Sequence, residues 1–362
     1  MSHALIVVII AVAYEQWQRF YLKNSYKHEV LSSFNFVLLG DTSIAGELGK
    51  KGTSSDITIY DRKANDKIIS YCFPNTYPDK LQPLLQSIAM SDYAIINITK
   101  LDTFLGEQLV AVDIFGIKNG FILYSYEIDA EKVKNIIKNT GLSDFTILDS
   151  LEQLKNSIAE MNPDFREKEQ EKEVKVKGED KGEGEGEKEG GVCVSVDHAF
   201  DVKGVGTVVL GSVRQGEIKT YDELILSPAN TPVLIKSIQM HDDPVTTSKK
   251  PSRVGLAIKG VSAKDISRGD IITSAGLAKI ANTDFQFKFI KNQFFKEDIS
   301  ETQNYMICVG LQIRTVKVKK ISESNLLQIT FEKPLAYLKN DKCILFRPDS
   351  KGMRIMGHGI ME

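Results

Sequence analysis

The segment FVLLGDTSIAGELGKKG, residues 36–52, places a glycine where the backbone could approach a phosphate. Its apolar run ends at Gly40 and predicts a buried strand, followed by a turn and a helix. In a phosphate-binding loop of the pattern GxxxxGK[ST], backbone amides hold the phosphates, the lysine neutralises their charge and the hydroxyl holds Mg²⁺. Here Gly46 comes one residue too late, and Glu47 and Leu48 follow it. The segment therefore has the frame of a phosphate-binding loop without its ligands.

The charged residues around this turn also disfavour a phosphate. Asp41 and Glu47 place negative charge where a triphosphate would lie, and like charges repel. Lys50 and Lys51 follow about one helical turn later, and we expect both to face solvent.

Composition argues against several other kinds of site. The formal net charge of -2 is close to neutral, so the chain as a whole has no strong basic field. The four cysteines lack CxxC spacing and the five histidines are scattered, so we expect neither a metal site nor a disulfide framework. Apolar contexts such as SYCFP and KCILF predict free, buried thiols in a reducing, cytoplasmic setting.

Strands and helices alternate between residues 34 and 162. Apolar runs predict strands at 34–40, 67–73, 92–98, 119–126 and 144–149. Helical periodicity covers residues 80–91, 105–115, 130–138 and 150–160. This alternation predicts an α/β domain with a parallel sheet covered by helices on both faces.

The chain changes character after residue 191. Short segments with period-two alternation are separated by glycine-rich turns, including GTVVLGSV, DELILS, VLIKSIQM, RVGLAIKG and KCILF. We expect two all-β domains, residues 192–276 and 277–362, each forming a β-barrel.

A charged segment separates the two halves. Eighteen of the 28 residues from 164 to 191 are charged, and Phe165 is the one aromatic among them. Such a segment buries too little apolar surface to offset its ordering entropy. We therefore expect residues 163–191 to be a flexible linker, with an acidic interaction segment as the alternative.

The first 33 residues form a separate N-terminal hydrophobic extension. Residues 4–14 are an apolar run of eleven, shorter than the ~20 residues that a helix needs to span a bilayer. A signal-peptide core is one interpretation, but the preceding Met-Ser-His lacks the usual positive charge. We favour a translation start placed too early, or a short hydrophobic helix, and expect no membrane partner.

The barrel sequences resemble the elongation factor Tu family of translational GTPases. VDHAFDVKGVGTVVLGSVRQGEIKTYDELIL (196–226) and RVGLAIKGVSAKDISRGDIIT (253–273) resemble the second domain, and CILFRPDSKGMRIMGHGIM (343–361) resembles the third. SIQMHDD followed by RVGLAIKGV is most similar to the archaeal selenocysteine-specific elongation factor. The resemblance implies a P-loop GTPase-like parallel-sheet domain followed by two β-barrels, and the missing loop residues make that first domain degenerate.

The other nucleotide-binding signatures of the family are also lost. The magnesium-binding DxxG motif falls near Cys72 and Asn75, and the guanine-reading NKxD motif corresponds to Tyr126-Glu127-Ile128-Asp129. Gly40 and Asp129 are the remnants, and Asp129 has a simpler interpretation as the N-cap of the next helix. We expect no GTP or Mg²⁺ cofactor, no catalytic residue and no GTP hydrolysis.

The resemblance assigns an aminoacyl pocket to the second domain. The family's Asp-His pair and later Arg correspond to Asp197, His198 and Arg253, and Arg with a polarised His would favour an anion such as a selenolate. The alternative is an exposed strand histidine beside an ordinary cross-strand ion pair.

Basic residues in the last domain are candidate contacts for an RNA backbone. They are Lys317, Lys319, Lys320, Lys351 and Arg354. We therefore expect an elongation-factor-like protein that binds tRNA or the ribosome through its barrels. Two alternatives remain: a GTP-binding factor with an unconventional loop, and a scaffold that contacts other proteins.

Overall fold

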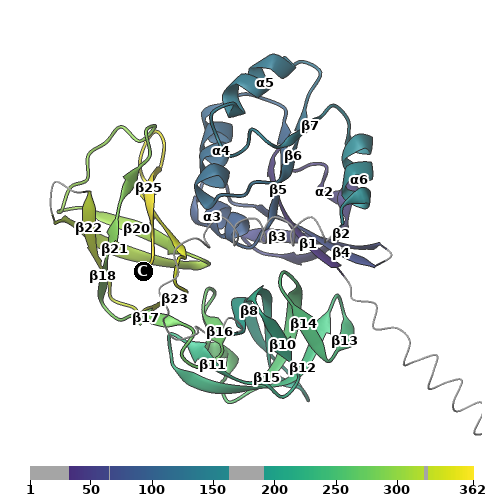
Figure 1. Cartoon of the computed structure of the whole chain (residues 1–362), viewed down its shortest axis with the longest axis vertical. Coiled ribbons are helices and arrows are strands. Elements are labelled where there is room, and N and C mark those ends of the chain that lie inside the picture. The colour runs from purple at the N-terminus through teal and green to yellow at the C-terminus, as the bar shows by residue number, and fades with distance from the viewer. Residues whose placement is uncertain (1–31, 65, 163–190, 322–324) are drawn as a thin grey trace, which may run out of the picture.

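The computed structural model describes residues 32–64, 66–162, 191–321 and 325–362 (Figure 1). The N-terminal extension up to residue 31 and residues 163–190 of the predicted 163–191 linker lie outside the described residues. Within the described ranges, no helix is long and apolar enough to cross a membrane.

The first domain is built on a seven-stranded sheet of order β2-β3-β4-β1-β5-β6-β7. The strands are β1 (Ser32–Gly40), β2 (Lys50–Ser54), β3 (Ile57–Ala64), β4 (Lys67–Pro74), β5 (Tyr93–Ile98), β6 (Gly120–Tyr124) and β7 (Thr146–Leu148). The five predicted strands β1 and β4 to β7 pair in parallel, as expected. An antiparallel hairpin, β2–β3, extends this sheet beyond β4.

Helices cover both faces of the sheet. The helices α3 (Gln82–Ala89), α4 (Thr103–Phe115) and α5 (Ala130–Ile137) pack on one face, and α6 (Leu151–Glu160) packs on the other. Asp102, Asp129 and Ser150 cap the last three of these helices with their side-chain oxygens, which satisfies amides that have no partner in the helix.

The helix predicted after Gly40 is present but short. It is a single turn, α2 (Ala45–Leu48), and it ends at Gly49, after which the chain enters β2. Gly46 is a poor helix former, and the β-branched residues of the segment TSSDITIY favour strand pairing.

Aromatic side chains fill the space beside the short helix. Phe36 stacks on Tyr71 with ring centroids 5.6 Å apart and lies 5.2 Å from Tyr93. Its ring also lies 6.3 Å from that of Phe121, and all four side chains are buried. The sheet therefore keeps a packed face although one helix is reduced to a turn.

The second domain is a closed barrel. Its main sheet has the order β11-β16-β8-β9-β15-β12-β13, and an additional β11–β12 pairing closes it. The strands are β8 (Cys193–Val202), β9 (Gly206–Gln215), β10 (Glu217–Lys219), β11 (Glu223–Ser227), β12 (Thr231–Met240), β13 (Asp243–Val245), β14 (Thr247–Lys249), β15 (Arg253–Lys259) and β16 (Ile271–Thr273). The predicted all-β character is confirmed.

The third domain is a barrel that is nearly closed. Its main sheet runs β18-β22-β21-β20-β24-β25-β19, and β19 follows β18 directly in the chain. The strands are β17 (Lys279–Ala281), β18 (Asp284–Lys288), β19 (Ile290–Lys291), β20 (Asn304–Val309), β21 (Gln312–Lys320), β22 (Leu326–Thr330), β23 (Leu335–Tyr337), β24 (Lys342–Phe346) and β25 (Ile355–Ile360). All four cysteines of the chain are buried and free.

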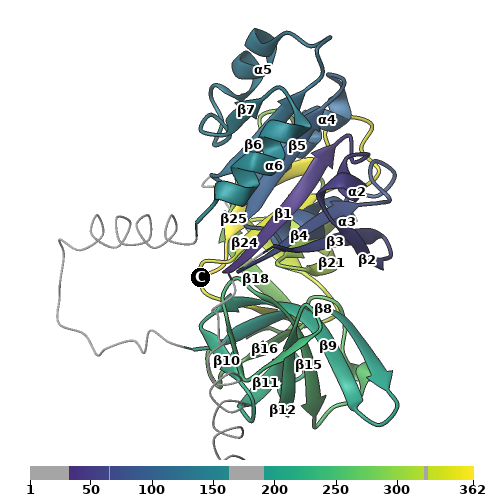
Figure 2. The ribbon, with the colours of Figure 1, turned by 90° about the vertical axis from the view of Figure 1, so that its right-hand side faces the viewer.

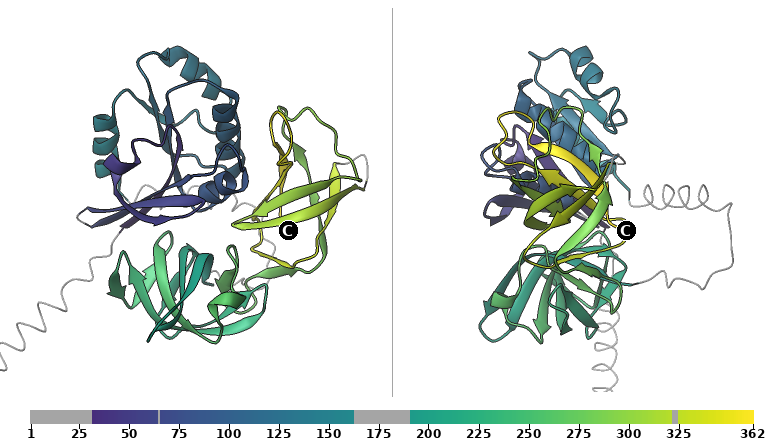
Figure 3. Two further views of the ribbon diagram at one scale, coloured as in Figure 1. Left: turned by 180° about the vertical axis from the view of Figure 1, so that it is seen from behind. Right: turned by 90° about the vertical axis from the view of Figure 1, so that its left-hand side faces the viewer.

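Both barrels pack against the first domain. Figure 2 shows the first barrel beneath the sheet, and Figure 3 shows the second barrel beside α3 and α4 from behind. Leu311, Phe346 and Ile355 of the second barrel belong to the same apolar cluster as the buried residues of α3 and α4. Gln86 of α3 donates to the carbonyl oxygen of Leu311 at 2.7 Å. The first domain and the second barrel therefore share buried contacts made by their own side chains.

Candidate functional site

The turn after β1 has its backbone donors engaged inside the protein. Four amides donate to internal acceptors: Gly40 to Gln108 Oε1 (2.9 Å), Asp41 to the Asn97 carbonyl (2.8 Å), Ser43 to Asp41 Oδ1 (2.9 Å) and Ala45 to the Thr42 carbonyl (3.0 Å). A phosphate-binding loop needs such amides free to face the ligand. Four of the amides in this turn therefore already have acceptors within the protein.

Gly40 has a packing role in this turn. Its φ is +74°, and a Cβ built there would lie 2.1 Å from the carbonyl oxygen of Asn97. Asn97 also donates through Nδ2 to the carbonyl oxygen of Asp41 at 2.9 Å. The close approach of two strand ends is enough to require glycine here.

The other two nucleotide signatures carry structural contacts. Cys72 is buried, its thiol lies 3.2 Å from Ser91 Oγ, and burial raises the pKa of that thiol to about 11. Asn75 donates to the Ser55 carbonyl oxygen at 2.6 Å, which ties it to the β2–β3 turn. Asp129 accepts from the Glu131 amide at 2.9 Å as the N-cap of α5. Among the described residues, no group of three or more His, Cys, Asp or Glu is placed to hold a metal.

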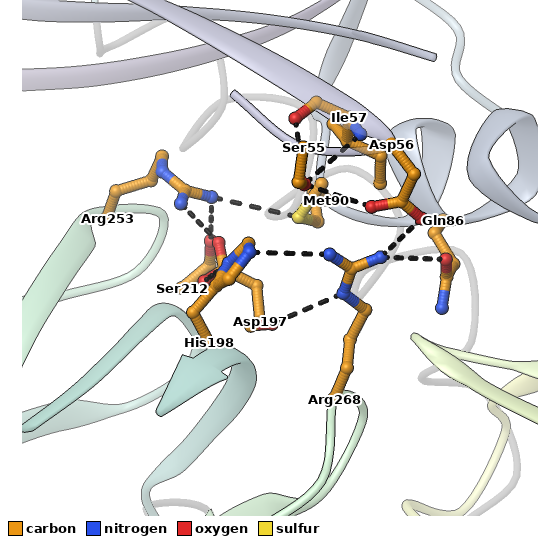
Figure 4. Close-up of polar contacts among 10 residues, drawn as sticks. All are labelled: Ser55, Asp56, Ile57, Gln86, Met90, Asp197, His198, Ser212, Arg253 and Arg268. Carbon is orange, nitrogen blue, oxygen red and sulfur yellow. Dashed lines mark hydrogen bonds and ion pairs between the residues drawn. The ribbon is translucent and has the colours of Figure 1, made fainter. Parts of the chain in front are cut away.

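Asp197, His198 and Arg253 meet on the first barrel (Figure 4). The β8–β9 register shifts between Val196 and His198, so Asp197 sits in a bulge, a feature that redirects side chains. Asp197 Oδ1 lies 3.0 Å from His198 Nδ1, and Asp197 Oδ2 accepts from Arg253 Nη2. The structure therefore brings together the three residues that the family resemblance selects.

The Asp197–Arg253 pair is enclosed at the junction with the first domain. The side chains of Asp197 and Arg253 are 3% and 17% exposed. Burial opposes ionisation of Asp197, but the charge of Arg253 and the hydrogen bond from His198 outweigh it and lower the pKa of the carboxyl. Arg253 also approaches Met90 Sδ of the first domain at 3.8 Å. The pair is a buried, matched ion pair rather than an exposed strand contact.

Arg268 completes this cluster, although the sequence analysis did not single it out. Its guanidinium donates from Nε to the Asp197 carbonyl oxygen (3.3 Å) and from Nη1 to Asp56 Oδ2 (2.8 Å) and Gln86 Oε1 (3.4 Å). Its Nη2 lies 3.4 Å from His198 Nε2. Arg268 thereby joins the barrel to the β2–β3 turn and to α3. The one signal in the sequence was its place in the SRGD turn beside a barrel strand.

The predicted basic contacts divide into two groups. Lys317, Lys319, Lys320 and Lys351 are exposed, and in β21 the alternating Val316 and Val318 are buried in the barrel. Lys317, Lys319 and Lys320 therefore form an outward-facing basic row along β21.

The prediction that Arg354 contacts RNA was wrong, because its side chain is buried between two domains. It is 8% exposed and donates from Nε to both carboxylate oxygens of Glu107 in α4, at 3.2 and 3.1 Å. Its Nη1 donates to the Pro78 carbonyl oxygen at 2.6 Å, and its guanidinium lies 5.4 Å from the centre of the Tyr77 ring. Arg354 therefore fastens the second barrel to the first domain.

Comparisons with known proteins place this architecture among translation elongation factors. The family model "Elongation factor Tu domain 2" matches residues 206–273, within the first barrel. An uncharacterised protein of Methanocaldococcus jannaschii is 36% identical over 317 residues, which cover 87% of this chain and 95% of that protein. The chain belongs to the same family as that protein, and it is homologous to the selenocysteine-specific elongation factors.

The selenocysteine-specific relatives are longer proteins. The M. jannaschii selenocysteine-specific elongation factor is 29% identical over 233 residues, which span 61% of this chain and 48% of the factor. Translation elongation factor SelB from Methanococcus maripaludis, in complex with the GTP analogue GppNHp, superposes with a TM-score of 0.73 at 23% identity, over 92% of this chain and 79% of that one. The chain thus has the SelB-like fold and spans about half the length of the M. jannaschii factor.

Proposed function

We propose that this protein is a translation-linked binding protein that works without a GTP cycle and holds tRNA or the ribosome through its barrels. The observation that carries the first part is the turn after β1, where four backbone amides already donate to internal acceptors. The family's phosphate cradle would have to be assembled from these same donors.

Reopening the turn for a nucleotide is unfavourable on three counts. Four hydrogen bonds would be exchanged, each contributing about 1 kcal/mol net. The triphosphate would face the carboxylate of Asp41 without a lysine to neutralise it. The helix that follows has only four residues, so it aligns few peptide dipoles toward an anion.

The relatives support a role distinct from selenocysteine delivery. M. jannaschii has both the uncharacterised relative, matched along 95% of its length, and a separate selenocysteine-specific elongation factor. Two proteins in one organism with a shared ancestry favour divided functions. The name of the second protein describes that protein, and we extend to this chain only the class of partner, tRNA or the ribosome.

The domain contacts support a fixed arrangement of the barrels. Glu107 pairs with Arg354, Asp56 with Arg268, and Arg214 with Asp341, so that each pair of domains is joined by an ion pair. These contacts use the chain's own side chains where a translational GTPase uses the γ-phosphate to order its switch segments. The β2–β3 hairpin contributes Asp56 to one of these pairs.

A nucleotide titration tests the first part of the proposal. Purified protein is titrated calorimetrically with GTP and with GDP, each with Mg²⁺, up to millimolar concentration. We expect no binding heat and no hydrolysis; a micromolar dissociation constant for either nucleotide would overturn the proposal and favour an unconventional nucleotide loop.

Recovery of native complexes tests the second part. Protein purified from its own cells at low salt should carry tRNA or ribosomal RNA, and the complex should weaken steeply as salt rises. A salt-insensitive complex that contains protein and no RNA would instead identify a protein scaffold.

A further inference from the structure

Three large apolar side chains are exposed at the carboxyl edge of the parallel sheet, where its strands end. Leu101 and Phe104 follow β5 and are 45% and 46% exposed, and Tyr126 follows β6 and is 93% exposed. β5 and β6 are parallel neighbours whose last residues, Ile98 and Tyr124, pair with each other, so the loops that follow them leave the sheet side by side. Large side chains that are exposed together on a folded domain are typical of a docking site.

This end of the sheet faces away from the first barrel. Figure 1 shows α5, which begins four residues after Tyr126, at the end of the molecule opposite that barrel. The ring of Phe104 meets that of Tyr77 edge-on, with centroids 6.3 Å apart, and the residue is still nearly half exposed. A partner therefore reaches Leu101, Phe104 and Tyr126 without separating the domains.

The charges around these side chains are mostly negative. The loops after β1, β5, β6 and β7, together with the first four residues of the helix that follows each loop, contain eight carboxylates and two lysines, Lys100 and Lys132. The carboxylates belong to Asp41, Glu47, Asp102, Glu127, Asp129, Glu131, Asp149 and Glu152. Lys134 and Lys155, which pair with two of them, add only two more cations one turn farther along the helices. The edge therefore repels an RNA backbone and attracts a cationic partner.

The helix N-termini at this edge offer little to an anion. An uncapped helix N-terminus favours negative charge because its first amides have no partner in the helix. Here Asp102 Oδ1 accepts from the Leu105 amide at 2.9 Å, and Asp129 Oδ1 accepts from the Glu131 amide at 2.9 Å. An anion would have to displace these caps and approach the surrounding carboxylates, whereas a cation would not.

Tyr126 has the chemistry of an anchor for a basic side chain. Its hydroxyl donates to Glu127 Oε1 at 3.1 Å, so an exposed aromatic ring and a carboxylate lie next to each other. The face of a tyrosine ring attracts an ammonium or guanidinium group, and a carboxylate pairs with the same group. Lysine and arginine also carry an aliphatic stem, which suits the apolar surface of Leu101 and Phe104.

We propose that Leu101, Phe104, Tyr126 and the surrounding carboxylates form a surface that docks a lysine- or arginine-rich segment of a partner protein. The partner places basic side chains on the carboxylates and on the ring of Tyr126, and an apolar side chain against Leu101 and Phe104. The proposed RNA contacts lie on β21 of the second barrel, so this inference goes beyond the proposed function and does not depend on it. Because the two surfaces carry opposite charge, each one disfavours the partner of the other.

The test measures binding of a fluorescent synthetic peptide to the full-length protein by anisotropy at low salt. The peptide has about twelve residues, enough to cross both loops when extended, and contains lysines and two leucines. We expect saturable binding of one peptide per protein with a micromolar dissociation constant. Tyr126→Ala removes the anchor and should weaken binding about tenfold, and Glu127→Gln should weaken it about threefold and reduce its salt dependence.

The chain offers a matched control for the anchor. Tyr221 of the first barrel is another exposed tyrosine, 75% exposed, and Tyr221→Ala should leave the affinity for the peptide unchanged. A peptide with serine in place of both leucines should bind more weakly, because it has no apolar contact with Leu101 and Phe104. If Tyr221→Ala weakens binding as much as Tyr126→Ala, or if the serine peptide binds equally well, the attraction is general charge and the docking surface is refuted.

Binding of bulk tRNA by the same variants separates this inference from the proposed function. Tyr126→Ala should leave the affinity for tRNA unchanged. If Tyr126→Ala weakens tRNA binding and not peptide binding, the edge contacts RNA and the protein-docking inference is overturned. If wild type binds tRNA but no peptide, the docking inference fails and the proposed function stands. If wild type binds the peptide through Tyr126 but no tRNA, the docking surface stands and the RNA partner is wrong.

Discussion

Two polar regions of this molecule use their hydrogen-bonding groups in opposite ways. In the turn after β1, four backbone amides donate hydrogen bonds to Gln108, Asn97 and other acceptors of the same domain. In the cluster on the first barrel, Arg268 and Arg253 remain charged and lie at the junction between domains. The first region uses these donors within its own domain, whereas the second places two guanidinium groups where two domains meet.

Under the proposed function, this contrast accounts for a GTPase-like frame that works without a nucleotide. The α/β domain supplies Asp56 in the β2–β3 turn, Gln86 in α3 and Glu107 in α4 to contacts with the two barrels. Those contacts depend on the sheet and on α3 and α4, which are all intact. Under the proposed function, the α/β domain therefore serves as a support for the two barrels.

The largest expected effect is at the enclosed Asp197–Arg253 pair. Asp197→Ala leaves Arg253 buried without its counter-charge, and such losses cost about 3–5 kcal/mol. Urea denaturation measures the free energy of unfolding. A loss below about 1 kcal/mol would mean that water reaches this pair freely.

A smaller loss is expected in the nucleotide-like turn. Gly40→Ala introduces a Cβ 2.1 Å from the Asn97 carbonyl oxygen at φ +74°, and such strain costs about 1–3 kcal/mol. Gly46→Ala is the matched control, since nothing lies within 4 Å of its Cβ position. The same denaturation experiment should show a loss for Gly40→Ala and none for Gly46→Ala; equal effects would refute a packing role for Gly40.

A third prediction concerns the basic row on β21. Replacing Lys317, Lys319 and Lys320 together by Ala should weaken tRNA binding about tenfold at low salt and reduce the salt dependence by about one counterion per lysine. The three lysines in residues 132–138, on or next to α5, supply the control on the first domain. If that control weakens binding equally, the barrel face carries no specific share of the affinity.

The smallest effect is expected from acid. The pKa of Asp56 and that of Asp197 are lowered below 3.8 in the folded protein, so their contribution is complete above that pH and is lost as the pH falls through the folded values. The free energy of unfolding should decrease below about pH 4, and the Asp56→Asn variant should lose less over that window. An identical acid dependence in both proteins would show that Asp56 gains nothing from Arg268.

Much of the fold could be predicted from the sequence because its elements have clear local periodicity. Strands such as β4 and β5 and the helix α4 began and ended within a few residues of the expected bounds. The helix after Gly40 was predicted, but the β2–β3 hairpin that begins two residues after its end was not.

The site was predictable only where a family motif covered it. Asp197, His198 and Arg253 were found through the resemblance, and the barrel register brings them together. Arg268 and Asp56 are 212 residues apart, and the sequence around neither residue predicts their contact. Arg354 looked like a surface charge because its partner, Glu107, lies 247 residues earlier in the chain.

The most direct test of the central claim is the affinity for tRNA measured with and without nucleotide. Filter binding or fluorescence anisotropy with bulk tRNA is carried out at one salt concentration, in the presence of Mg²⁺, with no nucleotide and with about 1 mM GTP or GDP, the top of the usual KM range. The account predicts one and the same dissociation constant under all three conditions. A dissociation constant for tRNA that changes with GTP would contradict the account. The RNA affinity of the barrels would then still depend on a nucleotide bound in the first domain.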